Sequence, residues 1–219
     1  MCELTDLAAT GRPVQIERYD RLHRDGRKLI QDWLERAIAR GHGAESSFEA
    51  FIYLWIAFNG WAACVTGKDA DREWQRALIA DPNLNEQFDR LASKETATRA
   101  AAHGFAELWP IFRVADLRAR GIDCRSGAYE SRAAMTRAYL DSGARQFAPR
   151  CYLEHDEVPL DWGHILASLY RVRCNLFHGE KARSSENDRL VVARACETLL
   201  AFLEEAGLLC SAQKHRAGS

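Results

Sequence analysis

The 219-residue sequence has almost no net charge, because 30 lysines and arginines face 31 aspartates and glutamates. Proteins that hold nucleic acid by bulk electrostatics carry a large basic excess, so that class is excluded and any contact with nucleic acid must be local. Hydrophobic residues make up 47% of the chain, which is enough for one sizeable core. The composition is that of an ordinary globular protein.

The seven cysteines show neither a disulfide framework nor a zinc-binding pattern, since they are scattered, odd in number and never spaced as Cys-x-x-Cys. The N-terminus has acids at Glu3 and Asp6 where a signal peptide has bases, and no apolar segment follows. These absences predict a cytoplasmic protein that uses no metal and no other cofactor.

The motifs of several enzyme classes are also missing. There is no glycine-rich phosphate loop, no Gly-x-Ser-x-Gly and no His-Glu-x-x-His, so nucleotide hydrolysis, serine hydrolysis and zinc proteolysis have no support. A metal site built from His155, Asp156, Glu157 and His164 matches no known compact spacing. A polar loop before Pro159 explains these residues more simply.

Apolar residues at helical spacing predict four long helices, and no alternating run predicts a strand. Ser46 and Glu49 have the spacing of a capping box at the start of the second helix. The predicted fold class is all-α, a four-helix bundle with a helical insertion between the second and third main helices. The four helices are expected over residues 14–40, 46–67, 160–177 and 185–207.

The second helix is apolar enough to raise the question of a membrane span, because residues 50–67 contain no charge. Asn59 and Gly60 interrupt this stretch, and no second span accompanies it. A helix that is hydrophobic all round is also what a core helix surrounded by other helices looks like. The sequence therefore favours a buried core helix and no membrane.

The predicted insertion covers residues 68–159 and is broken into short helices by proline and glycine. Its later part, residues 112–150, holds eight arginines against four acids, with Tyr129, Tyr139 and Phe147 between them. Such a segment is compatible with a basic, aromatic face for single-stranded nucleic acid. More often, a segment rich in charged residues is simply a solvent-exposed surface.

The most informative segment is residues 170–179, YRVRCNLFHG. Arginine forks onto phosphate oxygens, and histidine exchanges a proton near neutral pH, so Arg171, Arg173 and His178 together suit the cleavage of a phosphodiester without a metal. Gly179 predicts the end of the helix directly after the histidine.

An ideal helix places Arg171, Asn175 and His178 on one polar face, where they could converge on a phosphate. Arg173 lies at the flank of the apolar face and must find a partner or a cleft, because an unpaired buried guanidinium is costly. The alternative is that both arginines form ordinary ion pairs and His178 only ends the helix.

The pattern of an arginine, four to six residues, a histidine and a glycine resembles the HEPN superfamily. It fits here as Arg173 with four residues before His178, or as Arg171 with six. The segment 51–60, with Asn59 inside it, is similar to the aromatic helix of uncharacterised HEPN families near the Apea-like group.

Two positions depart from the HEPN pattern. Cys174 follows Arg173, where many HEPN nucleases have Asn, Asp or His, and Asn175 is a candidate substitute one position later. Glu180 stands where toxins controlled by AMP transfer have a tyrosine, which disfavours that form of regulation.

The resemblance implies a single HEPN-like domain over residues 1–219 that acts on RNA as a metal-independent endoribonuclease. It also implies a homodimer with the site at the subunit interface. In the expected mechanism His178 accepts a proton from a ribose 2′-OH and Arg173 stabilises charge on the phosphoryl oxygens. Supporting roles are expected for Arg171, Asn175 and Asn59, and nucleic-acid binding for Lys181 and Arg183.

The same resemblance suggests a setting in toxin–antitoxin, abortive-infection or anti-phage defence, with an antitoxin or regulator as a further partner. Two alternatives stay open. One is a non-catalytic HEPN module that binds RNA or another protein, and the other is a helical scaffold whose polar segment stabilises a subunit interface.

Overall fold

The computed structural model describes residues 14–41, 43, 46–122, 132–141, 159–181, 183 and 185–209. These residues form ten helices and no strand, which confirms the all-α class. The helices are α1 (Glu17–Asp20), α2 (Arg24–Arg40), α3 (Ser47–Thr66), α4 (Asp71–Ala80), α5 (Pro82–Ala92), α6 (Ala97–Ala106), α7 (Val114–Ala119), α8 (Arg132–Asp141), α10 (Trp162–Phe177) and α11 (Glu186–Glu205).

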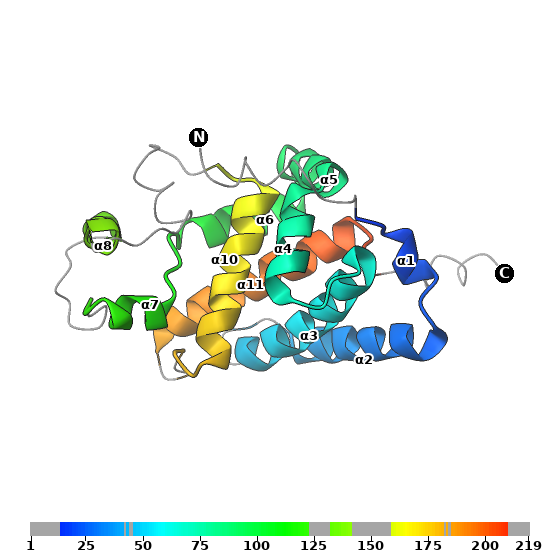
Figure 1. Cartoon of the computed structure of the whole chain (residues 1–219), viewed down its shortest axis with the longest axis horizontal. Helices are drawn as coiled ribbons and strands as arrows, with labels where there is room; N and C mark the ends of the chain where they lie inside the picture. The colour runs from blue at the N-terminus through cyan, green and yellow to red at the C-terminus, as the bar shows by residue number, and fades with distance from the viewer. Residues whose placement is uncertain are drawn as a thin grey trace.

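Helices α2 and α3 lie side by side at one edge of the molecule, and α10 crosses in front of α11 (Figure 1). The prediction of one helix over residues 14–40 is wrong, because the chain breaks between α1 and α2. His23 has an extended ψ of 142°, and its Nδ1 accepts a hydrogen bond from the Asp25 N–H at 3.3 Å. This cap starts a new helix inside an otherwise continuous apolar pattern.

The start of α3 is close to the prediction, but the predicted capping box is wrong. The Ser46 hydroxyl donates to the Gly41 carbonyl at 3.0 Å, and no side-chain cap bond forms. Glu49 instead pairs with Arg40 at 3.2 Å. Both contacts tie the start of α3 to the end of α2, which closes the hairpin between them.

Helix α3 is the centre of the main core. Phe51, Phe58 and Trp61 are fully buried, and the Trp55 ring lies 6.0 Å from the ring of Trp74 on α4. By length and composition α3 is the one described helix that could cross a membrane. However, 56% of its apolar window is buried inside the protein, as expected for a core helix.

The described part of the predicted insertion divides into two regions. Helices α4 and α5 contribute Trp74, Leu78 and Phe88 to the main core, and α6 packs on α11. In contrast, Phe112 and Tyr139 belong to a second, smaller cluster built around α7 and α8. Figure 1 shows α7 and α8 to one side of α10, away from the α2–α3 hairpin.

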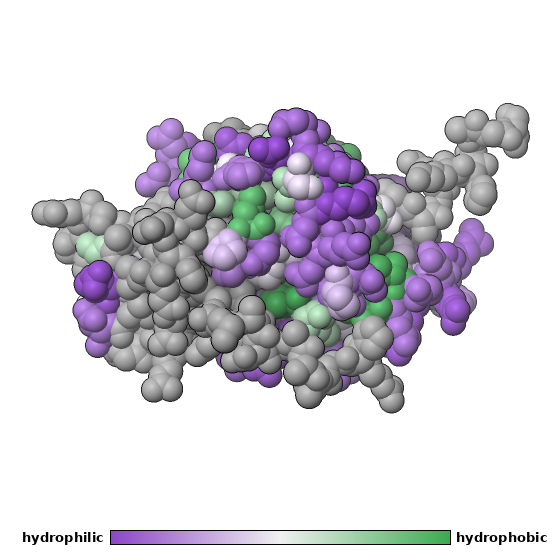
Figure 2. Space-filling view, turned by 90° about the horizontal axis from the view of Figure 1, so that it is seen from above, coloured by the Kyte–Doolittle hydropathy of each residue, from purple (hydrophilic) through white to green (hydrophobic). Residues whose placement is uncertain are grey.

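The face of the molecule above α10 and α5 is mainly hydrophilic over the described residues (Figure 2). Hydrophobic residues show there only in small separate areas. This agrees with a core closed by its own helices.

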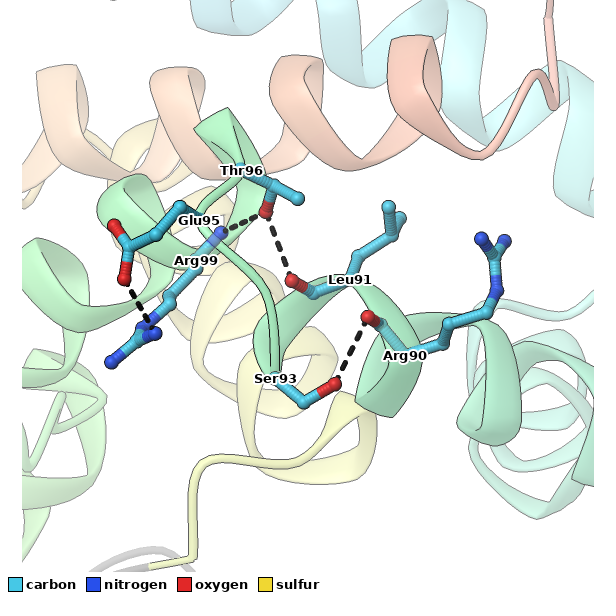
Figure 3. A network of polar contacts seen from close by, with 6 residues as sticks. All are labelled: Arg90, Leu91, Ser93, Glu95, Thr96 and Arg99. Carbon is cyan, nitrogen blue, oxygen red and sulfur yellow. Dashed lines mark hydrogen bonds and ion pairs between the residues drawn. The ribbon is translucent and has the colours of Figure 1, made fainter.

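The turn between α5 and α6 is held by local polar contacts (Figure 3). The Thr96 hydroxyl donates to the Leu91 carbonyl at 2.9 Å and accepts from the Arg99 N–H at 3.1 Å, which caps α6. Arg99 also pairs with Glu95 at 2.8 Å on the surface. The ion pair of Arg99 with Glu95 is local and solvent-exposed, so the Arg99 side chain is a suitable control below.

Glu205 of α11 also caps α6, since its carboxylate accepts from the backbone N–H of Ala97 at 3.0 Å and of Thr98 at 2.9 Å. Burial alone would raise the pKa of Glu205, but hydrogen bonds from Thr98, Ala97 and Thr96 outweigh it and lower the pKa. We expect Glu205→Gln to lower the free energy of unfolding by about 1 kcal/mol at neutral pH.

The sign of the pH dependence follows from the lowered pKa of Glu205. As the pH falls, the unfolded chain takes up the proton first, so the stabilisation is complete above the ordinary glutamate pKa of about 4.3. It is lost as the pH falls through the lower pKa of the folded state. Urea unfolding at pH 7 and pH 3 should therefore show the wild type and variant converging in acid, while Glu204→Gln, an exposed neighbour, changes little.

Candidate functional site

Helix α10 carries the segment 170–179 and has well-defined ends. Asp161 caps its N-terminus by accepting from the His164 N–H at 2.8 Å. At the other end Gly179 has a φ of 69°, and the Glu180 N–H donates to the Asn175 carbonyl at 2.8 Å. These are the features of a Schellman motif, so the predicted stop at Gly179 is confirmed.

His178 is the residue at which α10 ends, and its side chain is exposed. Within the part of the chain that the structure describes, its imidazole has no hydrogen bond or ion pair. The ring is therefore open to solvent.

Arg173 points toward the N-terminus of α4. Its guanidinium pairs with Asp71 at 3.0 Å and lies 5.1 Å from the ring of Phe177 and 5.6 Å from the ring of Tyr170. The side chain is only 23% exposed, and its Nε is buried without an acceptor. The prediction that Arg173 needs a partner is confirmed, and the partner is the first residue of α4.

Arg171 points away from Arg173, toward α7. Its Nη1 lies 3.9 Å from Asp116, and its side chain is 19% exposed. Burial lowers the pKa of Arg171, and the Asp116 carboxylate opposes this shift. Because residues two apart lie about 160° apart around a helix, the two arginines contact different elements. His178 is on the Arg171 side, about 20° from it.

Asn175 is buried at 2% exposure, and its amide is bonded at both ends. Its Nδ2 donates to the Phe112 carbonyl at 2.7 Å, and its Oδ1 accepts from the Val114 N–H at 3.0 Å. The amide therefore holds the start of α7 against α10. Both polar atoms of the Asn175 amide therefore face the start of α7 and Phe112 before it, and the convergence of Asn175 with Arg171 on a phosphate stays a prediction.

Asn59 lies on α3, where its Oδ1 is buried and accepts no hydrogen bond. Among the described residues it forms no hydrogen bond with Arg173 or His178. No hydrogen bond among the described residues therefore links Asn59 to the two motif side chains that it was expected to support.

The two basic residues after Gly179 differ in their surroundings. Lys181 pairs with Asp188 at 2.6 Å, and its side chain is only 11% exposed. Arg183 is 61% exposed and lies 3.8 Å from Glu49. Of the two side chains, that of Arg183 is the more exposed to solvent.

The sequence did not predict the carboxylates that face the motif arginines. Asp71 and Asp116 are far from α10 in the sequence and reach it only through tertiary packing. The basic segment 112–150 was recognised, but Tyr139 is 1% exposed and cannot stack with bases. Tyr129 and Phe147 lie outside the described residues.

Elsewhere, a hollow of about 360 Å³ lies between α6 and α11, lined by alanines and by Arg194 and Glu197. It contains none of the predicted site residues. Among the described residues no group of three or more His, Cys, Asp or Glu is arranged to hold a metal ion. No known protein family, curated protein or solved structure matches the chain.

Proposed function

We propose that the chain is a metal-independent endoribonuclease of the HEPN type, and that α2, α3, α10 and α11 are its four-helix bundle. These are the four longest described helices. The observation that carries the proposal is the exposed imidazole of His178 at the end of α10, five residues after the guanidinium of Arg173. A cytoplasmic role in defence or as a toxin belongs to the same proposal.

In this mechanism His178 accepts the proton of a ribose 2′-OH, and the 2′-oxygen attacks the adjacent phosphorus. The bond to the 5′-oxygen of the next nucleotide breaks, and that oxygen takes up a proton. Arg173 donates hydrogen bonds to the phosphoryl oxygens, where negative charge develops. The products are a 2′,3′-cyclic phosphate and a 5′-hydroxyl.

Helix geometry favours a site shared between two copies. Arg173 and His178 lie about 140° apart around the axis of α10. On one helix their side chains therefore point in different directions and do not meet at one phosphate. Phe177 lies between them and is 50% exposed. We propose a homodimer in which Phe177 is covered and the two motif segments face each other.

The proposal is tested with purified protein and single-stranded RNA. We expect fragments ending in a 2′,3′-cyclic phosphate, and we expect EDTA to leave the rate unchanged. An oligonucleotide with 2′-deoxyribose at the cut site should stay intact, since it lacks the nucleophile. Cleavage of that oligonucleotide, or loss of activity with EDTA, would overturn the mechanism.

One observation favours a second candidate, an RNA-binding HEPN module without catalysis. The guanidinium of Arg173 already bonds Asp71 and packs against Phe177, as a structural arginine does. Such a module would bind RNA and leave it intact under every condition in which the fold is stable. The same product assay therefore separates the two candidates.

A further inference from the structure

Beside the motif segment, on the Arg171 side of α10, two arginines lie near one carboxylate. Arg113 and Arg171 approach opposite oxygens of Asp116, at 3.4 and 3.9 Å. We call Arg113 and Arg171, with Asp116 between them, the α7 cluster.

The α7 cluster has more positive charge and more hydrogen-bond donors than Asp116 can satisfy. The Nε of Arg113 is buried and has no acceptor. The contact from Arg171 to Asp116 at 3.9 Å is an ion pair but too long for a hydrogen bond. Half-buried guanidiniums with unused N–H donors are suited to binding a phosphate. A phosphate has several acceptor oxygens and can form bidentate hydrogen bonds with one guanidinium.

The α7 cluster is also well placed relative to His178. Arg171 and His178 share one side of α10, about 10 Å apart along its axis. Arg118 of α7 pairs with Glu180, two residues after His178, at 2.7 Å. Helix α7 therefore runs beside the motif segment from Arg171 to its end.

We propose that the α7 cluster binds a phosphate of the single-stranded RNA next to the phosphate that is cleaved at His178. This inference rests on the proposed function and assigns the RNA-binding subsite of the same enzyme. In the free protein Asp116 holds the arginines in place, and in the complex it competes with the phosphate for them.

The test uses a fluorescent 20-nucleotide RNA with 2′-O-methyl groups throughout, which binds but offers no 2′-OH nucleophile. Anisotropy titrations at several salt concentrations give Kd and its salt dependence. We expect Arg113→Gln and Arg171→Gln each to weaken binding roughly tenfold. Each should also lower the slope of log Kd against log salt by about 0.7, the value for one phosphate contact on a single strand.

The variant Asp116→Asn gives the sharpest result, because it should tighten binding several-fold by removing the competing carboxylate. A purely structural role for the cluster would lower thermal stability in all three variants and leave Kd unchanged. Arg99→Gln, an exposed ion-paired arginine on α6, is the matched control and should bind like the wild type. Thermal unfolding checks that each variant is folded.

Wild-type affinity and salt slope in Arg113→Gln and Arg171→Gln would overturn the inference, as would weaker binding by Asp116→Asn or no binding by the wild type. The ribonuclease proposal fails separately. If the variants bind as expected but natural RNA is never cut, the phosphate subsite is supported and the ribonuclease proposal is rejected. If the wild type cuts RNA but the variants bind RNA normally, only the proposed subsite is rejected.

Discussion

Replacing His178 with alanine is expected to slow RNA cleavage by about a hundredfold or more, because it removes the base proposed to accept the 2′-OH proton. The exposed side chain makes no described contact, so the fold should stay intact. Single-turnover cleavage of a 5′-labelled RNA measures the rate, and circular dichroism checks the helices.

Arg173→Ala should reduce the same rate by a similar factor, since it removes the proposed hydrogen-bond donor to the developing charge. This variant also frees Asp71, so thermal unfolding must accompany the assay. Arg173→Lys keeps the charge but not the forked geometry and is expected to recover only part of the activity. Near wild-type cleavage by His178→Ala would rule out the assigned base.

Asn175→Ala is expected to lower the free energy of unfolding by about 2 to 4 kcal/mol, the largest loss of stability among these variants. It leaves the Phe112 carbonyl and the Val114 N–H without the side chain to which they are hydrogen-bonded. Both groups lie next to the buried position of Asn175. Chemical denaturation at pH 7 gives the difference.

Asn187→Ala is the matched control, because Asn187 is exposed on α11 and should change stability by less than about 0.5 kcal/mol. A variant at Asn175 as stable as this control would show that the amide does not hold α7 on α10. Because Asn175 also lies in the motif segment, a stability loss should be measured before any change in its activity is attributed to chemistry.

Periodicity and caps were sufficient to predict α10 and α11 from the sequence. In the structure Asp161 and Ser185 cap the two helices by accepting backbone hydrogen bonds, and the predicted stop at Gly207 has a positive φ of 66°. The break before α2 was missed because apolar spacing continues across it. His23 interrupts the helix through a local backbone bond that periodicity does not register.

The candidate site was predictable in part, for a similar reason. The end of α10 at His178 was predictable because it depends on Gly179, a neighbouring residue in the sequence. The partners of Arg171 and Arg173 are set by which helices pack beside α10, and no local pattern encodes that packing. The burial of Asn175 was missed because the helical wheel gave it a polar face without showing that α7 covers that face.

The pair formed by Arg173 and Asp71 limits how this chain can diverge over generations. Loss of either residue alone leaves a half-buried charge without its counter-ion, which costs more than losing both together. Substitutions at the two positions should therefore be inherited jointly. Among descendants that keep this fold, those with an apolar residue at one position should carry an uncharged residue at the other.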